Sequence, residues 1–104
     1  MTLKHWRLKH LGGNESIIDG DEKEVCYLCG GKATDTHHIF EGSGRRALSD
    51  FYGLTVRLCR ECHSKIHDTS CPEMEYLHRV GQRAYEAQIG TREMFINDFV
   101  RSYL

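Results

Sequence analysis

The chain has 104 residues, enough for one small domain and near the lower limit for a self-sufficient hydrophobic core. Its formal net charge of −1 argues against a purely electrostatic nucleic-acid binder, although a locally charged cleft can still meet DNA. The first residues mix apolar and basic side chains, and no stretch is apolar over a bilayer's thickness. We therefore expect neither a signal peptide nor a membrane-spanning segment.

Residues 1–24 are predicted to be a basic N-terminal segment followed by an acidic linker. The bases and the single tryptophan of the first part are Lys4, Trp6, Arg7 and Lys9. Such a segment could contact a nucleic-acid strand, but a frayed tail is the favoured interpretation. A Gly-Gly-Asn turn precedes residues 14–24, which carry five acids and few apolar side chains. The folded domain is accordingly predicted to span residues 25–104, with a motif core at 25–68.

The motif core reads as two strands and a short helix. The predicted order is a turn over residues 26–31, a strand over 34–40, a flexible polar loop over 41–46, a strand over 54–58, and a helix over 60–68. Gly30 and Gly31 should let backbone amides approach a metal-bound sulfur. The two strands are expected to form a hairpin.

Two packing helices are predicted over residues 70–104. Ser70 and Glu73 have capping-box spacing and Pro72 suits a first helical turn, so one helix should run from here to Gly90. Its apolar stripe is Met74, Leu77, Gly81, Ala84 and Tyr85. Thr91 can cap a final helix, whose apolar face is Phe95, Ile96, Phe99, Val100 and Tyr103.

Four of the five cysteines form two Cys-x-x-Cys pairs, Cys26 with Cys29 and Cys59 with Cys62. Zinc favours four thiolates in tetrahedral geometry, and this spacing lets one turn supply two of them. In a reducing compartment the pairs indicate a structural zinc site rather than two disulfides or four unrelated thiols. Cys71 has no partner at this spacing and is read as an ordinary thiol.

Histidines suggest a second metal site. His63 and His67 lie four residues apart and would share one helix face. Side chains of the neighbours Cys62 and His63 diverge by about 100° on a helix, so they are poorly placed to bind one ion together. A C2H2 finger also fails, because the two pairs are separated by far more than the usual twelve or so residues. Histidines 5, 10 and 78 are read as ordinary surface or packing residues.

The motif core resembles the HNH endonucleases, which belong to the ββα-metal nucleases. The matching residues are the pair Cys26-x-x-Cys29, the doublet His37-His38, and Cys59-x-x-Cys62-His63-x-x-x-His67 leading into a helix. The resemblance covers roughly residues 25–68. It implies a small ββα-metal hairpin–helix core with a four-cysteine structural zinc. Together with the two packing helices that the sequence pattern predicts, this gives an α+β fold.

The resemblance also implies residue roles. His37, His63 and His67 would bind a catalytic divalent metal, and His38 would be the general base that activates water. The family usually has an asparagine shortly before the second cysteine pair, which supports the base. Here the matching position is Leu54, so Asp50 or a backbone carbonyl would have to orient His38.

The chemistry of phosphodiester hydrolysis suits these residues. A base must take a proton from water, and a cation must offset charge on the phosphate oxygens. Imidazole serves as a base near neutral pH, and three neutral imidazoles leave the cation its charge and open positions. Mg²⁺, Mn²⁺, Ni²⁺ or Zn²⁺ would be suitable, with affinity favouring the transition metals. Arg45 and Arg46 could contact DNA phosphates or form a solvated loop tip, and the sequence favours neither.

The leading prediction is a metal-dependent DNA endonuclease that leaves 5′-phosphate and 3′-hydroxyl ends, as the resemblance implies. An alternative is a non-catalytic, zinc-stapled DNA-binding or adaptor module, which the missing asparagine favours. A third is a metallo-hydrolase acting on another substrate. The expected setting is the cytoplasm of a bacterium or a virus-infected bacterial cell. A protein partner could supply sequence specificity to so small a chain.

Overall fold

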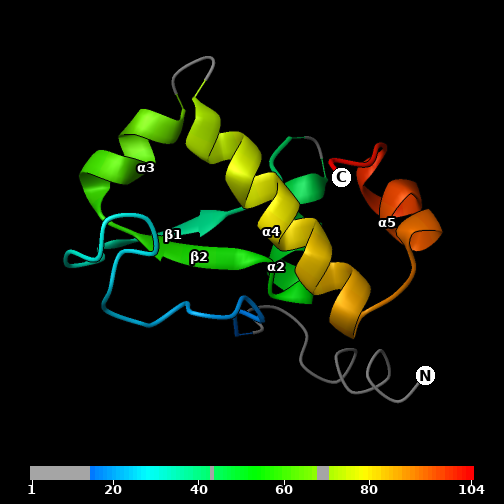
Figure 1. The fold of residues 1–104 in the computed structure, drawn as a ribbon, viewed down its shortest axis with the longest axis horizontal. Coiled ribbons are helices and arrows are strands. Elements are labelled where there is room, and N and C mark those ends of the chain that lie inside the picture. The colour runs from blue at the N-terminus through cyan, green and yellow to red at the C-terminus, as the bar shows by residue number, and fades with distance from the viewer. Residues whose placement is uncertain (1–14, 43, 68–70) are drawn as a thin grey trace.

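The computed structural model describes residues 15–42, 44–67 and 71–104. Its elements in chain order are β1 (Asp35–His38), α2 (Arg45–Tyr52), β2 (Thr55–Leu58), α3 (Arg60–Ile66), α4 (Pro72–Gln88) and α5 (Arg92–Phe99) (Figure 1). The α+β class is thus confirmed. Predictions for the basic N-terminal segment, for histidines 5 and 10 and for the Ser70 cap lie outside the described residues.

The two strands pair antiparallel, with His37 opposite Val56 and His38 opposite Thr55. Alternate residues of a strand point to opposite faces of the sheet. Asp35 and His37 therefore share one face, which α3 contacts, and His37 is fully buried there. His38 belongs to the other face. The strands are shorter than the predicted 34–40 and 54–58 but lie within those ranges.

Helix α2 corrects the prediction of a flexible polar loop, because Arg45 and Arg46 form its first turn. The prediction followed the glycines at 42 and 44, and those glycines instead mark the helix start. Gly44 and, after the last turn, Gly53 both adopt positive φ angles of 79° and 76°, which suit glycine. The connection between the strands is consequently a helical segment rather than a tight turn.

A buried serine fixes α2 against the end of β1. The hydroxyl of Ser49 donates to the carbonyl oxygen of Phe40 at 2.9 Å and accepts from the amide of Phe40 at 3.0 Å. Ser49 is fully buried, so both bonds are shielded from water. This pair of bonds places the outward face of α2 beside His38.

Helix α3 starts at a cysteine. Cys59 is the N-cap, and its sulfur accepts from the amide of Cys62 at 3.4 Å. The helix ends at Ile66, two residues before the end of the predicted 60–68 helix, and His67 forms the C-cap. In Figure 1, α3 lies at one end of the molecule and α5 at the other.

Helix α4 packs closely on the residues that follow β1. A Cβ at Gly81 would lie 2.9 Å from the side chains of both Ile39 and Phe40, so only glycine permits this approach. The predicted stripe is confirmed, with Leu77, Gly81 and Tyr85 buried. Pro72 stands in the first turn as expected, and Cys71 is the N-cap. His78 packs between the rings of Phe40 and Tyr103, which confirms its packing role.

Helix α5 is capped as predicted, because the Thr91 hydroxyl accepts from the amide of Met94 at 3.1 Å. Phe95 and Phe99 are fully buried. The prediction of a broad apolar face is wrong for Ile96 and Val100, which are exposed. The helix ends at Phe99, and Val100 is the C-cap with a φ of 80°. The buried face of α5 is therefore narrower than the apolar face that the sequence predicts.

Residues 15–24 contain no helix and are mostly exposed, as predicted, but they are also attached to the core. Ile18 is buried in the core, and the amide of Ile17 donates to the carbonyl of Gly53 at 2.8 Å. The carboxylate of Asp21 accepts from the amide of Arg57 at 2.7 Å. This segment therefore covers one edge of the sheet. Of the helices in the described ranges, none has the length and apolar character to cross a membrane.

Candidate metal centres

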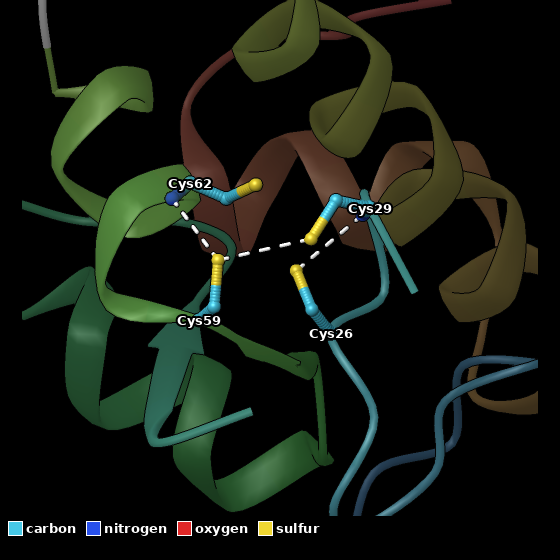
Figure 2. A group of neighbouring side chains, drawn as sticks. All are labelled: Cys26, Cys29, Cys59 and Cys62. Atoms are coloured by element: carbon cyan, nitrogen blue, oxygen red, sulfur yellow. Dashed lines mark hydrogen bonds between the residues drawn. The ribbon is translucent and has the colours of Figure 1, made fainter. Parts of the chain in front are cut away.

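The four cysteines of the two pairs form one cluster. Their sulfur atoms lie within 4.8 Å of one another, and Figure 2 shows all four side chains directed toward a shared space. Cys26 and Cys29 come from the turn before β1, whereas Cys59 and Cys62 come from the start of α3. The sulfurs of Cys29 and Cys59 are 3.8 Å apart across the gap between these two segments.

Backbone amides surround the sulfurs. Amide-to-sulfur hydrogen bonds join Cys29 to Cys26 at 3.5 Å, Gly31 to Cys29 at 3.4 Å, and Cys62 to Cys59 at 3.4 Å. Burial raises the pKa of Cys26, but hydrogen bonds from the backbone amides of Cys59, Cys29 and Leu28 outweigh it and lower that pKa to about 6. Burial and the neighbouring thiols raise the pKa of Cys62.

These opposite pKa shifts of Cys26 and Cys62 are expected of neighbouring thiols, because a negative charge on one sulfur makes ionisation of the next less favourable. Without a cation, ionising one thiol disfavours ionising the next. A divalent ion at the centre would remove that conflict and favour all four thiolates. The cluster can therefore hold a structural metal such as zinc, in the closed four-sulfur arrangement such sites use. Cys71 is not part of it, and its thiol donates to the carboxylate of Glu73 at 3.0 Å.

A second cluster consists of His37 from β1 with His63 and His67 from α3. One ring nitrogen of each lies within 4.8 Å of the others, so the three could hold a metal ion. The centres of the rings of His63 and His67 are 5.0 Å apart, and each lies within 5.9 Å of the His37 ring. Strand pairing and the four-residue spacing on α3 bring these residues together.

His37 provides the test of whether these residues fit a metal. Its side chain is fully buried, and neither ring nitrogen has a hydrogen-bond partner among the described residues. A buried polar atom left without a partner is costly. Burial, followed by the nearby histidines, lowers the pKa of His37 to about 3, so the ring stays neutral and offers a lone pair. Both properties suit a metal ligand.

Asp35 orients the second histidine. Its Oδ2 lies 2.8 Å from Nδ1 of His63, which leaves Nε2 of that ring to face the cluster. Arg60 also donates to this carboxylate, at 3.0 Å. The contact with His63, and then that with Arg60, lowers the pKa of Asp35 to about 2. Carboxylates behind ligating histidines commonly fix the ring and its tautomer.

A cleft of about 370 Å³ opens beside the histidine cluster. Its lining residues are Thr36, His38, Glu41, Gly42, Arg46, His63 and His67. His38 is thus on the cleft wall, with Nε2 at 3.4 Å from Oδ1 of Asp50 on α2. Leu54, the position of the expected asparagine, is fully buried in the core and has no part in the cleft.

The two arginines of α2 separate in space. Arg46 lines the cleft, whereas Arg45 does not, although both stand in the first helical turn. The sequence had given them one shared role. Helix geometry explains the difference, because adjacent residues point about 100° apart.

Sequence reasoning missed Asp35 and Glu41. The signal for Asp35 was present, since residues two apart on a strand share a face and Asp35 precedes His37 by two. For Glu41 no periodic signal exists, because it lies past the end of β1. Its Oε2 is 3.5 Å from Nδ1 of His37 and 3.9 Å from Nε2 of His67.

Comparisons with protein-family models, with curated proteins and with solved structures found no significant match to this chain. The functional argument therefore depends on the residues of the chain and their arrangement.

Proposed function

We propose that this protein is a metal-dependent endonuclease that hydrolyses DNA phosphodiester bonds on a ββα-metal scaffold. The observation that carries the proposal is the meeting of His37, His63 and His67 at the edge of a cleft that His38 and Arg46 also line. A separate four-thiolate cluster relieves the histidines of any structural task. This division is the one expected when one metal holds a small fold and another acts on substrate.

His38 is the proposed general base. It stands on the cleft wall but outside the group of three histidines, so its ring is available to water. Asp50 contacts Nε2, and a carboxylate in that place favours the tautomer with hydrogen on Nε2. Nδ1 then keeps its lone pair and can accept the proton of the attacking water. Asp50 would thereby take the orienting role of the absent asparagine.

Arg46 is the proposed phosphate contact. Its guanidinium carries a permanent charge at the cleft, where a backbone phosphate would lie within reach of His38. A divalent cation on the three imidazoles would supply the charge that stabilises the phosphoryl oxygens. Phosphate contacts of this kind position the duplex without reading its sequence. The proposed substrate is accordingly DNA without inherent sequence preference.

Plasmid nicking tests the proposal. Supercoiled plasmid is incubated with the zinc-loaded protein and, in turn, Mg²⁺, Mn²⁺, Ni²⁺ or Zn²⁺, and the open-circular product is measured. Wild type should nick with at least one metal. His38→Ala should nick about 10²–10⁴-fold more slowly, the range for loss of a positioned base. The bound-metal content of this variant should be unchanged, because His38 is not among the metal-binding histidines.

Two results would decide against hydrolysis. Undiminished nicking by His38→Ala would remove the general base from the proposal. Absence of nicking with every metal, together with DNA binding and one zinc per chain, would identify the adaptor module instead. That second function has one observation in its favour, the buried leucine at position 54.

A further inference from the structure

Glu41 is the one acidic residue among the described residues that line the cleft beside the histidine cluster. Its Oε2 contacts Nδ1 of His37 at 3.5 Å and Nε2 of His67 at 3.9 Å. The side chain is 39% exposed and lines the cleft, so it reaches both the buried ring and solvent. Asp35, by contrast, contacts His63 alone among the three rings of the cluster.

These distances are too long for ordinary hydrogen bonds, which join nitrogen and oxygen at about 2.7–3.2 Å. Indeed, Nδ1 of His37 has no hydrogen-bond partner among the described residues. The distances do match atoms that surround an ion. With bonds of about 2.0–2.2 Å, the ligands of a tetrahedral zinc stand roughly 3.3–3.6 Å from one another. The His37–Glu41 separation of 3.5 Å falls in that range, and the His67–Glu41 separation of 3.9 Å lies just above it. Glu41 is not in the group whose ligand atoms all lie within 4.8 Å, so its exposed side chain would have to turn toward the cluster to complete the site.

We propose that Glu41 is the fourth protein ligand of the histidine metal site, adding one carboxylate oxygen to three imidazole nitrogens. The inference rests on the metal site of the proposed function and deepens it. A carboxylate lowers the net charge of the bound divalent site by one. It also makes the site more favourable to harder ions such as Mn²⁺, which prefer oxygen ligands.

Exposure gives the four ligands unequal roles. His37 is enclosed and cannot leave the cluster without disturbing the core. Glu41 lies on the cleft, where a phosphate oxygen would enter. Substrate would enter from this side and take the place of one of the three ligands that line the cleft, Glu41, His63 or His67, which reconciles four protein ligands with a site that must open for chemistry.

Metal binding by paired variants tests the role of Glu41 apart from catalysis. The four-cysteine site is first filled with zinc, and Co²⁺ is then titrated while its visible absorption is recorded. Glu41→Gln keeps the size of the side chain but removes the charge and the carboxylate. Glu61→Gln, an exposed acid on α3 that does not line the cleft, is the matched control.

Glu41→Gln should bind Co²⁺ about tenfold more weakly or worse, since even residues behind the ligands have effects of this size. Its Co²⁺ spectrum should change, because the oxygen ligand has been replaced, and Glu61→Gln should match wild type in both respects. The affinity of Glu41→Gln for Mn²⁺ should fall more than its affinity for Co²⁺, because Mn²⁺ depends more on oxygen ligands. Equal affinity in all three proteins, or weaker binding with an unchanged spectrum, would overturn direct ligation.

The two proposals fail in different ways. A wild type that nicks plasmid while Glu41→Gln keeps its Co²⁺ affinity and spectrum would leave the nuclease standing and remove Glu41 from the ligands. A wild type that never nicks, with Co²⁺ binding that depends on Glu41, would leave the metal site standing and remove the nuclease.

Discussion

The two clusters share α3 but are surrounded by opposite chemistry. Sulfurs of the cysteine cluster receive hydrogen bonds from backbone amides, such as that of Cys62 to Cys59. Rings of the histidine cluster face carboxylates, as His63 faces Asp35. Thiolates are anions that need donors, whereas neutral imidazoles carry an N–H that needs an acceptor. The surroundings of the cysteine cluster thus suit negatively charged thiolates, and those of the histidine cluster suit neutral imidazoles.

The comparison extends to how each cluster meets solvent. The cysteine cluster lies between two chain segments, with Cys26 buried, Cys59 and Cys62 partly buried and Cys29 exposed. The histidine cluster opens onto the cleft through His63 and His67. This difference supports the proposal that the cysteine cluster would hold a structural ion and that the histidine cluster would present an ion to the cleft.

The largest effect is expected when the cysteine cluster loses one of its sulfurs. Cys59→Ser removes a zinc ligand and the sulfur that caps α3, so we expect loss of zinc and of folded structure. Structural zinc contributes roughly 10 kcal/mol or more in small domains, as much as their whole stability. Circular dichroism and bound-zinc content measure the outcome. Cys71→Ser, outside the cluster, is the control and should keep both zinc and fold.

A folded Cys59→Ser variant with one zinc still bound would contradict the prediction that zinc at the cysteine cluster holds the fold together. The two clusters would then no longer differ in the way proposed, because neither would be required for folding.

An intermediate effect on metal affinity is expected at the histidine cluster when the carboxylate of Asp35, which contacts His63, is removed. Asp35→Asn removes the charge that holds the ring, so metal affinity at this cluster should fall about 10- to 100-fold. Titration of the zinc-filled protein with Co²⁺ measures it. Arg60→Ala is the control, because Arg60 shares the carboxylate but is 78% exposed. Equal affinities for the two variants would mean that Asp35 does not act through His63.

The effect expected to be smallest near neutral pH is a change in how stability depends on pH. The pKa of His37 is about 3 in the folded protein against an ordinary 6.5, so between those values only the unfolded chain takes the proton. Stability therefore falls as pH drops below about 6.5, by up to about 1.4 kcal/mol per pH unit. His37→Gln cannot take this proton and should show a shallower decline.

Urea unfolding of both proteins at several pH values checks that slope, with one equivalent of zinc and the histidine site left empty of metal. Since both proteins have the same cysteine cluster, its own acid sensitivity cancels in the difference. Parallel declines would show that His37 is not held neutral by burial.

Much of the fold followed from local signals in the sequence. Thr91 capped its helix as expected, and Leu77, Gly81 and Tyr85 faced the core at helical spacing. Cysteine spacing predicted the members of the closed cluster, which the structure brings together. These features depend on residues close in sequence, where turn and helix geometry alone decide the outcome.

Features that depend on distant contacts were missed. Helix α2 is stabilised by the bonds of Ser49 to Phe40, nine residues earlier, which no local pattern announces. The packing of Ile18 and the place of Glu41 likewise depend on tertiary structure. The side chains of Arg45 and Arg46 point in different directions because both residues lie on a helix, which the sequence did not predict at this position.

The sulfur of Cys59 belongs to the cysteine cluster and also caps α3, the helix that carries His63. If the cysteines hold zinc, that zinc would fix the start of the helix that presents His63 to the other cluster. Removal of zinc would then be expected to weaken metal binding at the histidines, although no histidine touches it, because one helix serves both clusters.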